Sequence, residues 1–438
     1  MSRYFLIKSM GCQMNRYDCD RIADLLCKCG NWQPTEDENV ADLFVLNTCS
    51  VREKASEKVF SELGRWNLIK LSRPTLMIAV GGCVSMEEGR EIFRRAPYVD
   101  AVFGTQTGHR LPDILQRIQC GERHILDLEL PHLEKFDYFP EPGVRGPSAF
   151  LSIMEGCDNF CSYCIVPYTR GREESRSMRG IMLEAQQLVD QGVREINLLG
   201  QNVNSYRDPE SGTGLAGLIR RLARLREIDR LRFTTSHPAK MDDEMVAVYA
   251  DEPKLVSHLH LPVQSGSNRI LQLMRRRYTR EYYLELIAKL RKARPSLAIS
   301  TDIIVGFPNE SDNDFQDTLD LVKEVAFDSS FSFIYSPRPH TPAAEMADSV
   351  PLAVKRERLA ILQQQLSQQA ARYSEQMVGS VQSVLVTGGS KHDNRVLSGK
   401  TENNRVINFD GDSCYIGRLV NVRVTEALPN SLRGELVI

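Results

Sequence analysis

The first hundred residues alternate short apolar runs with longer amphipathic segments. The apolar runs predict strands, at residues 4–7, 42–46 and 76–80. Apolar positions with helical spacing follow the runs, at residues 18–29, at 53–71 and from residue 86 onward. This alternation of strand and helix favours an open parallel sheet covered by helices.

Strand and helix patterns then alternate six times in the middle of the chain. Strands are predicted near residues 150–154, 194–199, 231–235, 256–261, 297–305 and 330–335. Helical patterns lie between them, for example at residues 182–191, 242–250 and 314–325. Six units are too few to close an eight-fold barrel, so we expect an open, partial barrel with its chemistry at the carboxyl ends of the strands.

The remaining segments set the expected domain boundaries. A linker rich in proline, glycine and acidic residues is predicted from about residue 130 to 147. A long helix is predicted over residues 352–376, and short strands separated by glycines from Gly379 onward predict a small antiparallel β-barrel. We therefore expect an α/β protein with domains at residues 1–130, 143–376 and 377–438.

Composition narrows the function classes. With 26% charged and 42% hydrophobic residues, the chain has the composition of an ordinary soluble globular protein. A formal net charge of -2 argues against a globally basic nucleic-acid binder, although local basic patches remain possible. The chain shows no secretion signal and no apolar run long enough to span a membrane, so we expect a cytoplasmic protein. Its 11 cysteines then indicate metal or redox chemistry in a reducing compartment.

Three cysteines lie in one short run, Cys157, Cys161 and Cys164. This spacing lets one loop surround a single metal centre, and no histidine is near in sequence to complete a closed zinc site. Three unrelated core thiols are improbable at this spacing. An iron–sulfur cluster with cysteine on only three of its irons fits better, because its fourth iron stays open for substrate or cofactor.

Three further cysteines, Cys12, Cys49 and Cys83, each lie just past one of the three predicted amino-terminal strands. In an open parallel sheet the loops after the strands leave from the same edge, so residues far apart in sequence can converge there. Chance placement of buried thiols would explain one such position more easily than all three. We therefore predict a second three-cysteine site that holds an auxiliary iron–sulfur cluster.

The run from Cys157 to Cys164 resembles the motif of the radical S-adenosylmethionine (SAM) superfamily. That resemblance implies that the open iron binds the amino and carboxylate groups of SAM and that Tyr163 packs near the SAM adenine. Polar residues at the ends of the predicted barrel strands would complete a SAM pocket, namely Gln201, Asn202, Ser236, Gln264 and Asp302. His237, next to Ser236, is more typical of a structural hydrogen-bonding residue than of a catalyst.

The continuation through Arg176 and the residues around Cys12 and Cys49 resemble the methylthiotransferases of this superfamily, and within them the tRNA-modifying branch usually called MiaB. In that branch N6-isopentenyladenosine at position 37 of tRNA becomes its 2-methylthio derivative. The resemblance implies two 4Fe–4S clusters, one that cleaves SAM and one that holds the transferred sulfur, and a second SAM that methylates this sulfur. Ser85 and Met86 depart from the Ala-Gln expected after the third auxiliary cysteine.

The carboxyl-terminal barrel resembles a TRAM domain, which implies RNA binding, although a plain structural cap remains an alternative. Two basic runs in the barrel region are expected to contact tRNA phosphates. The first comprises Arg220, Arg221, Arg224, Arg226, Arg230 and Arg232, and the second comprises Arg275, Arg276, Arg277, Arg280, Lys289, Arg291, Lys292 and Arg294. We further expect a partner protein that supplies electrons, such as a flavodoxin or ferredoxin. The chain itself is expected to be a monomer.

Two rival functions stay open at this point. One is another methylthiotransferase, whose substrate is a ribosomal-protein aspartate or a threonylcarbamoyl-adenosine in tRNA; the residues beside Cys12 and Cys49 argue against both. The other is an iron–sulfur RNA-binding protein without catalysis, which the polar residues at several strand ends disfavour.

Overall fold

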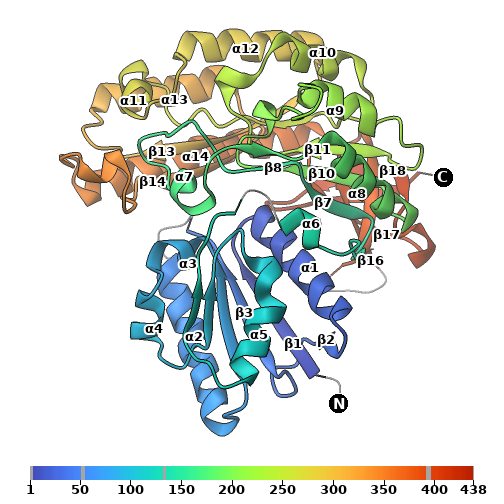
Figure 1. Ribbon diagram of the computed structural model, residues 1–438. Coiled ribbons are helices and arrows are strands. Elements are labelled where there is room, and N and C mark those ends of the chain that lie inside the picture. The colour runs from blue at the N-terminus through green and yellow to red at the C-terminus, as the bar shows by residue number, and fades with distance from the viewer. Residues whose placement is uncertain (1–2, 51–54, 132–134, 391–395, 438) are drawn as a thin grey trace. The chain divides into compact units, whose positions relative to one another are not determined.

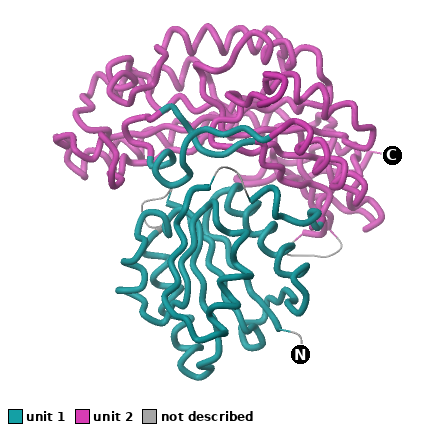
Figure 2. Tube along the Cα trace, viewed as in Figure 1, with its two compact units in different colours: residues 1–143, 154–159, 165–176 teal, residues 144–153, 160–164, 177–438 magenta. Residues whose placement is uncertain are grey.

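The computed structural model describes residues 3–50, 55–131, 135–390 and 396–437. The chain forms two compact units (Figure 2). Unit 1 comprises residues 1–143, 154–159 and 165–176, and unit 2 comprises residues 144–153, 160–164 and 177–438. Each unit is described separately.

Unit 1 is built on a six-stranded parallel sheet with the strand order β2-β1-β3-β4-β5-β6 (Figure 1). Its strands are β1 Arg3–Met10, β2 Trp32–Pro34, β3 Leu43–Thr48, β4 Met77–Gly82, β5 Ala101–Phe103 and β6 Ile125–Asp127. The three strands expected from the sequence correspond to β1, β3 and β4. The other three have only three residues each, too short to show the period of a strand.

Helices cover both faces of this sheet. The helical segments of unit 1 are α1 Gln13–Lys28, α2 Ala55–Ser72, α3 Cys83–Glu88, α4 Glu91–Arg95, η1 Gly108–Arg110, α5 Leu111–Gln119, α6 Lys135–Tyr138 and α7 Val166–Arg170, and a small ladder joins β8 Met154–Glu155 to β9 Glu174–Ser175. Alternate β3 residues enter two cores: Phe44 packs with residues of α2, and Val45 packs with residues of α1 and α5. Because both faces are covered, all six β3 residues are buried. The expected start of α2 near Glu53 lies outside the described residues.

Unit 2 contains the six parallel strands of the expected partial barrel. They are β7 Ser148–Ser152, β10 Glu195–Leu199, β11 Arg230–Phe233, β12 His258–His260, β13 Ala298–Val305 and β14 Ser329–Ile334. They form two three-stranded sheets, which a parallel bridge between Leu231 and Leu255 connects. The expected architecture of six strand–helix units is thus confirmed.

The helices of the barrel follow its strands. They are α8 Met178–Asp190, η2 Val203–Ser205, α9 Leu215–Leu222, η3 Pro238–Lys240, α10 Asp243–Asp251, α11 Asn268–Leu273, α12 Arg280–Ala293, α13 Asp312–Val325 and η4 Pro342–Glu345. Several begin at a side chain that accepts a hydrogen bond from the first turn, as Ser177, Asp242, Ser267, Thr279 and Ser311 do.

Helix α14 (Leu352–Gln376) leads into a closed five-stranded barrel with the order β15-β16-β17-β19-β18. Its elements are β15 Val381–Gly389, β16 Val396–Thr401, β17 Val406–Asp410, η5 Ser413–Tyr415, β18 Leu419–Ala427 and β19 Leu432–Leu436. The pairing is antiparallel, as expected, except between β17 and β19, which are parallel.

Three arginines attach this carboxyl-terminal barrel to the rest of unit 2. Arg230 donates to the carbonyls of Lys400 and Ser383 at 2.8 and 2.7 Å, and Arg232 donates to that of Glu402 at 3.0 Å. These two arginines are buried, so their expected role as phosphate contacts is wrong. A third contact is the bidentate pair between Arg405 and Asp328, at 2.8 and 2.7 Å.

Loss of the Arg405 guanidinium should destabilise unit 2. In Arg405→Ala the Asp328 carboxylate, 3% exposed, stays buried without its cation, and breaking a buried pair in this way costs about 3 kcal/mol. Urea unfolding followed by circular dichroism would measure the loss. Arg423→Ala, at an exposed position of the same barrel, is the matched control and should leave the midpoint unchanged; equal midpoints for both variants would contradict the expectation.

Candidate functional site

Cys12, Cys49 and Cys83 lie at the carboxyl edge of the unit 1 sheet. Cys12 immediately precedes α1, Cys49 follows the last residue of β3, and Cys83 is the first residue of α3. Because β1, β3 and β4 are neighbours in the sheet, their three loops are adjacent. The Cys49 thiol lies within hydrogen-bonding reach of both Cys12 and Cys83. The structure therefore brings these three cysteines together.

Two glycines allow the loops to approach so closely. A Cβ on Gly11 would lie 2.3 Å from the Cβ of Cys49, and a Cβ on Gly82 would lie 2.2 Å from the carbonyl oxygen of Thr48. Gly82 also has a φ of 93°, in the region that favours glycine. A side chain at either position would push the loops apart.

Two asparagines join the first two loops. Asn15 Nδ2 donates to Asn47 Oδ1 at 3.0 Å and to the Thr48 carbonyl at 2.8 Å, and Asn47 Nδ2 donates to the Asn15 carbonyl at 3.1 Å. The Cys12 thiol lies 3.1 Å from Asn15 Oδ1. These bonds fix the relative positions of Cys12 and Cys49.

The acidities of the three thiols differ. The hydrogen bond from Cys49, reinforced by the positive charge of Arg170, lowers the pKa of Cys83 to about 6 and that of Cys12 to about 7. The pKa of Cys49, which donates these bonds, is raised. Because the thiolate is the form that binds metal, two of the three side chains are close to their ligand form at neutral pH.

Arg170, the last residue of α7, is held beside these thiols by a buried ionic network. Its guanidinium lies 3.1 Å from Asp18 and 3.5 Å from Glu155. Lys135 pairs with the same two carboxylates. All four side chains are buried, and such groups are stable only when their charges are matched. The sequence motif contained Arg170 but gave no sign of this role.

The segments around the other three cysteines belong to different units. Cys157 lies in unit 1, where its amide donates to the Gly171 carbonyl at 3.3 Å and Asn159 Nδ2 donates to its sulfur at 3.4 Å. Cys161 and Cys164 lie in unit 2. Between them, the Ser162 hydroxyl donates to the Leu273 carbonyl at 2.7 Å.

Tyr163, expected near the SAM adenine, packs against an apolar cluster of unit 2. Its members include Ile270, Met274, Phe307, Tyr335 and Ala343. The backbone of Ser162 also accepts a hydrogen bond from the Ala343 amide at 2.8 Å. The segment with Cys161 and Cys164 therefore has a fixed place in unit 2.

The other residues expected in the SAM pocket lie at the ends of the barrel strands. Gln201 and Asn202 follow β10, Ser236 follows β11, Gln264 follows β12, and Asp302 lies within β13. Gln264 has a φ of 73° and extends the pairing of β12, since its amide donates to the Asp302 carbonyl at 2.9 Å. Asp302 also has a partner that the sequence did not indicate, His260, whose Nε2 lies 3.4 Å away.

Two buried polar atoms at this rim have no hydrogen-bond partner among the described residues, Ser236 Oγ and His237 Nε2. Unpaired buried polar atoms are costly, so both are suited to contact a bound ligand. Burial lowers the pKa of His237 to about 2, which keeps its imidazole neutral. His237 can therefore donate or accept a hydrogen bond here, but it is no proton donor of the general-acid kind.

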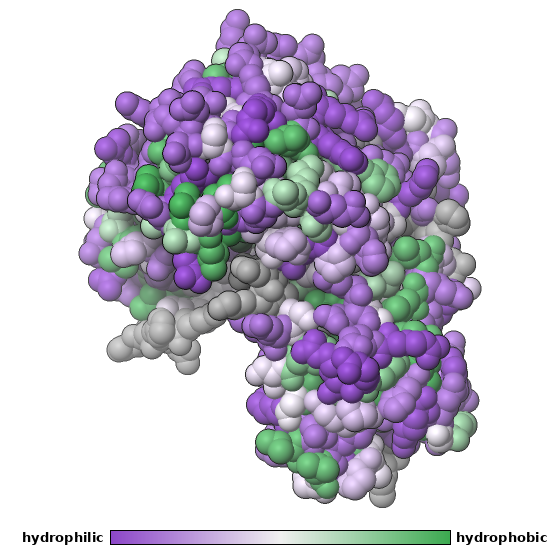
Figure 3. Space-filling view, turned by 90° about the vertical axis from the view of Figure 1, so that its left-hand side faces the viewer, coloured by the Kyte–Doolittle hydropathy of each residue, from purple (hydrophilic) through white to green (hydrophobic). Residues whose placement is uncertain are grey.

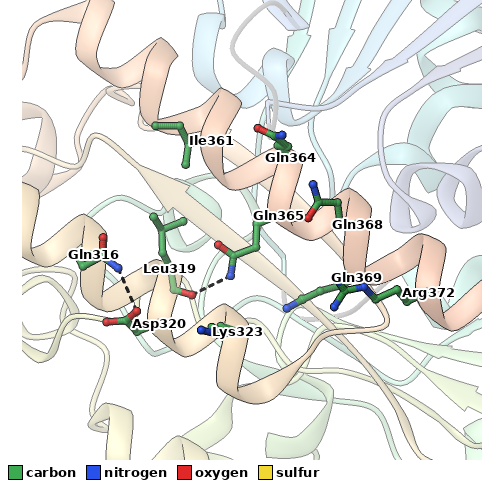
Figure 4. A pocket seen from close by; sticks show the side chains of 10 residues that line it. All are labelled: Gln316, Leu319, Asp320, Lys323, Ile361, Gln364, Gln365, Gln368, Gln369 and Arg372. Atoms are coloured by element: carbon green, nitrogen blue, oxygen red, sulfur yellow. Dashed lines mark hydrogen bonds between the residues drawn. The ribbon is translucent and has the colours of Figure 1, made fainter.

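A groove elsewhere in unit 2 is not part of this site. It lies between α13 and α14 (Figure 4). It is lined by Gln316, Leu319, Asp320, Lys323, Ile361, Gln364, Gln365, Gln368, Gln369 and Arg372. Gln365 and Gln369 donate to the carbonyls of Leu319 and Val322 at 3.0 and 2.8 Å, so these amides hold the two helices together.

Three protein families match successive parts of the chain. Residues 4–104 match the family described as "Uncharacterized protein family UPF0004", residues 151–322 match the radical SAM superfamily, and residues 375–437 match the TRAM domain. Proteins called tRNA-2-methylthio-N(6)-dimethylallyladenosine synthase from Vibrio cholerae serotype O1 and Histophilus somni are 54% and 53% identical, over 100% of this chain and 93% of each relative.

The chain belongs to this synthase family. As a member of a radical SAM family it uses SAM and a 4Fe–4S cluster. Solved structures agree in fold: the radical SAM methyltransferase TsrM from Kitasatospora setae has a TM-score of 0.60 at 16% identity, over 87% of this chain and 77% of that one. The cobalamin-dependent SAM radical enzyme OxsB has a TM-score of 0.55 at 13% identity, over 73% of this chain and 52% of that one.

The cysteine thiols and the polar atoms at the barrel rim of this synthase-family chain are chemically suited to the iron–sulfur clusters and the SAM that the family implies. Soft thiolates are the usual ligands of iron–sulfur clusters, and the rim of the barrel offers unpaired polar atoms to SAM. In the described part of the chain, however, no group of three or more His, Cys, Asp or Glu side chains is already arranged as a metal site. The unit 1 thiols instead form hydrogen bonds to one another.

The second basic run proves to be largely structural. Arg280 pairs with Glu324 at 3.1 Å, and Arg291 and Arg294 donate to backbone carbonyls. Arg276 is buried beside Cys161. Because Arg276 is buried, the phosphate contact expected of it is wrong, whereas the contacts expected of the half-buried Arg280, Arg291 and Arg294 stay predictions. Arg221, Arg224 and Arg226 of the first run are exposed, as are Arg275, Arg277 and Lys292 of the second.

Surface composition is mixed on the face shown in Figure 3, where hydrophobic residues occur in small groups among hydrophilic ones. Within the described ranges, each helix is too short or too polar to cross a membrane.

Removal of the Ser236 hydroxyl should affect the protein and its ligand in opposite directions. Without ligand, Ser236→Ala loses a buried hydroxyl that has no partner, so stability should stay equal or rise. The affinity for SAM should fall about fivefold, because a hydrogen bond worth about 1 kcal/mol is lost. Calorimetry of unfolding and of SAM binding would measure both effects. A loss of stability with unchanged SAM affinity would show that the hydroxyl serves the fold alone.

Proposed function

We propose that this chain transfers a methylthio group to C2 of N6-isopentenyladenosine at position 37 in the tRNA anticodon loop. The observation that supports this most is its 54% identity, over its whole length, to proteins named for that product. The convergence of Cys12, Cys49 and Cys83 agrees with it, because sulfur transfer needs a site beyond the one that cleaves SAM.

We assign the two cysteine groups to two clusters. Cys157, Cys161 and Cys164 would hold one 4Fe–4S cluster, and when bound it supplies, with SAM, the one-electron chemistry that an unactivated carbon–hydrogen bond requires. The unit 1 cysteines would hold a second cluster and the sulfur to be transferred. Arg170 would face this second group and balance part of its negative charge.

SAM would be bound at the rim of the unit 2 barrel. The contacts assigned to it are Tyr163, Gln201, Asn202, Ser236, Gln264 and Asp302. Gln264 has a positive φ although it is not a glycine, and the chain turns there at the rim. Backbone amides and hydroxyls converge at these strand ends. Ser236 Oγ and His237 Nε2 would find in SAM the partner that they otherwise lack.

The carboxyl-terminal barrel and the exposed arginines in and just after α9 would bind the tRNA. Arg221, Arg224 and Arg226 are free of the structural contacts that occupy Arg230 and Arg232. Nucleotides of an anticodon loop are splayed out at low cost, so the target base can reach a buried centre.

We further propose domain limits at residues 1–130, 143–376 and 377–438. The chain would act as a monomer in the cytoplasm, and a flavodoxin- or ferredoxin-like protein would supply its electrons.

The substrate should be an anticodon stem–loop that already contains the isopentenyl group. Its five apolar carbons can fill a pocket, and at about 0.8 kcal/mol per buried CH2 even partial burial gives a tens- to hundreds-fold preference over the unmodified adenine. Mass analysis of nucleosides from matched modified and unmodified stem–loops would measure product. Equal turnover of both would remove the isopentenyl requirement, and turnover of only a ribosomal-protein peptide would favour the protein-modifying alternative.

Gly82→Ala should remove the second cluster while leaving the first. The added Cβ meets the Thr48 carbonyl at 2.2 Å and must displace the loop with Cys83. We expect loss of one cluster's iron and sulfide and no methylthio product, with 5′-deoxyadenosine still formed.

The matched control is Gly121→Ala, also in unit 1. Gly121 has a φ of 99°, close to that of Gly82, but an added Cβ there meets nothing within 4 Å. It therefore reproduces the backbone strain, about 1–3 kcal/mol, without the clash. Full iron content in both variants would contradict the assignment of the unit 1 cysteines.

A further inference from the structure

Arg276 is a buried cation for which the described residues supply no acidic partner. Its residue is 7% exposed, and none of the aspartates or glutamates that the structure describes forms an ion pair with it. The groups that act on it electrostatically are Tyr278, Tyr163 and Cys161. A buried charge is costly unless an opposite charge compensates it.

The guanidinium of Arg276 is held in one orientation. Its Nε donates to Tyr278 Oη at 2.9 Å, and its Nη2 donates to the Pro262 carbonyl at 3.0 Å. Tyr278 Oη in turn donates to the Val263 carbonyl at 2.8 Å. These bonds hold Nε and Nη2. The remaining nitrogen, Nη1, donates to Cys161 Sγ at 3.5 Å.

Three other buried arginines of the chain do have carboxylate partners, whereas Arg230 donates to backbone carbonyls. In unit 2, Arg358 is 6% exposed and pairs with Glu310 at 2.7 Å, and Arg232 pairs with Glu195 at 3.4 Å. In unit 1, Arg170 pairs with Asp18 and Glu155. Arg276 differs from these three. Among the described groups that act on it, the one that becomes a thiolate on binding metal is Cys161, whose sulfur lies 3.5 Å from Nη1.

We propose that Arg276 is a positioning residue for the cluster on Cys157, Cys161 and Cys164, and that its N–H···S bond and charge raise the reduction potential of that cluster. This inference rests on the cluster assignment made above. The missing counter-charge is then the cluster itself, whose thiolates and sulfides are negative. The arginine orients Cys161 and favours the reduced state, since reduction adds a further negative charge beside the buried cation.

The consequence for the proposed reaction is the ease of electron entry. Hydrogen bonds to the sulfurs, net charge and burial are the means by which a protein sets the potential of an iron–sulfur cluster. Arg276 combines all three at one ligand. A weak physiological reductant could then reduce a cluster that would otherwise accept an electron only from a stronger one.

The test is a redox titration followed by electron paramagnetic resonance. It uses the full-length chain with Cys12→Ala, Cys49→Ala and Cys83→Ala, so that only the cluster in question contributes. Arg276→Gln should shift the reduction equilibrium at least tenfold toward the oxidised state, which is 59 mV for a one-electron couple. Arg276→Lys keeps the charge and should recover more than half of this shift. SAM affinity is measured on the same samples.

Control variants separate this role from a structural one. Arg358→Gln removes an equally buried guanidinium and should lower the unfolding midpoint without moving the potential. If Arg276→Gln assembles no cluster, Tyr278→Phe replaces it: losing the acceptor of Arg276 Nε should give a smaller shift of the same sign.

Three outcomes would overturn the proposal. An unchanged potential in both Arg276→Gln and Tyr278→Phe would show that the N–H···S bond has no electrostatic role. An unchanged potential with weakened SAM affinity would identify the SAM carboxylate as the counter-charge. Absence of any cluster from the starting variant would refute the cluster assignment itself, and with it the proposed function.

Discussion

The contact between the backbones at Gly82 and Thr48 determines what the edge of the unit 1 sheet can hold. The Cα of Gly82 is so close to the Thr48 carbonyl that no side chain fits between them. This contact, with the one between Gly11 and Cys49, lets loops from β1, β3 and β4 share a volume that normally sized residues would keep apart. The hydrogen bonds between Asn15 and Asn47, and those among the three thiols, form between these loops.

Each cysteine group also has one buried arginine, but the charge around the two arginines differs. Arg170 is matched by Asp18 and Glu155, and Lys135 completes a network of two cations and two anions. Its field at Cys83 is therefore partly offset by neighbouring carboxylates. Arg276 has no such carboxylate in the described part of unit 2, so its field at Cys161 acts almost undiminished. The same side chain type can thus suit two centres with different requirements for charge.

The sequence predicts those features that depend on local pattern and chain topology. The strand ends after residues 10, 48 and 82 and the order of a parallel sheet suffice to bring Cys12, Cys49 and Cys83 to one edge. Strands β2, β5 and β6 escape prediction because three residues do not establish a period. Arginines in a dense basic run are normally solvent-exposed, which made Arg230, Arg232 and Arg276 look like phosphate contacts. Their burial depends on carbonyls and sulfur supplied by distant segments, and no local pattern records such partners.

The attachment of the carboxyl-terminal barrel limits how freely this domain can be exchanged. Arg230 and Arg232 belong to β11 of the other barrel, yet their guanidiniums are satisfied by the carbonyls of Ser383, Lys400 and Glu402. A chain shortened before Gly379 would leave the Arg230 guanidinium without these acceptors and the Asp328 carboxylate without Arg405, whereas Arg232 would keep its pair with Glu195. The barrel is therefore no interchangeable module: a graft from another protein would have to present carbonyls at the same places and an arginine within reach of Asp328, so most of the joint depends on backbone shape and one contact on side-chain identity.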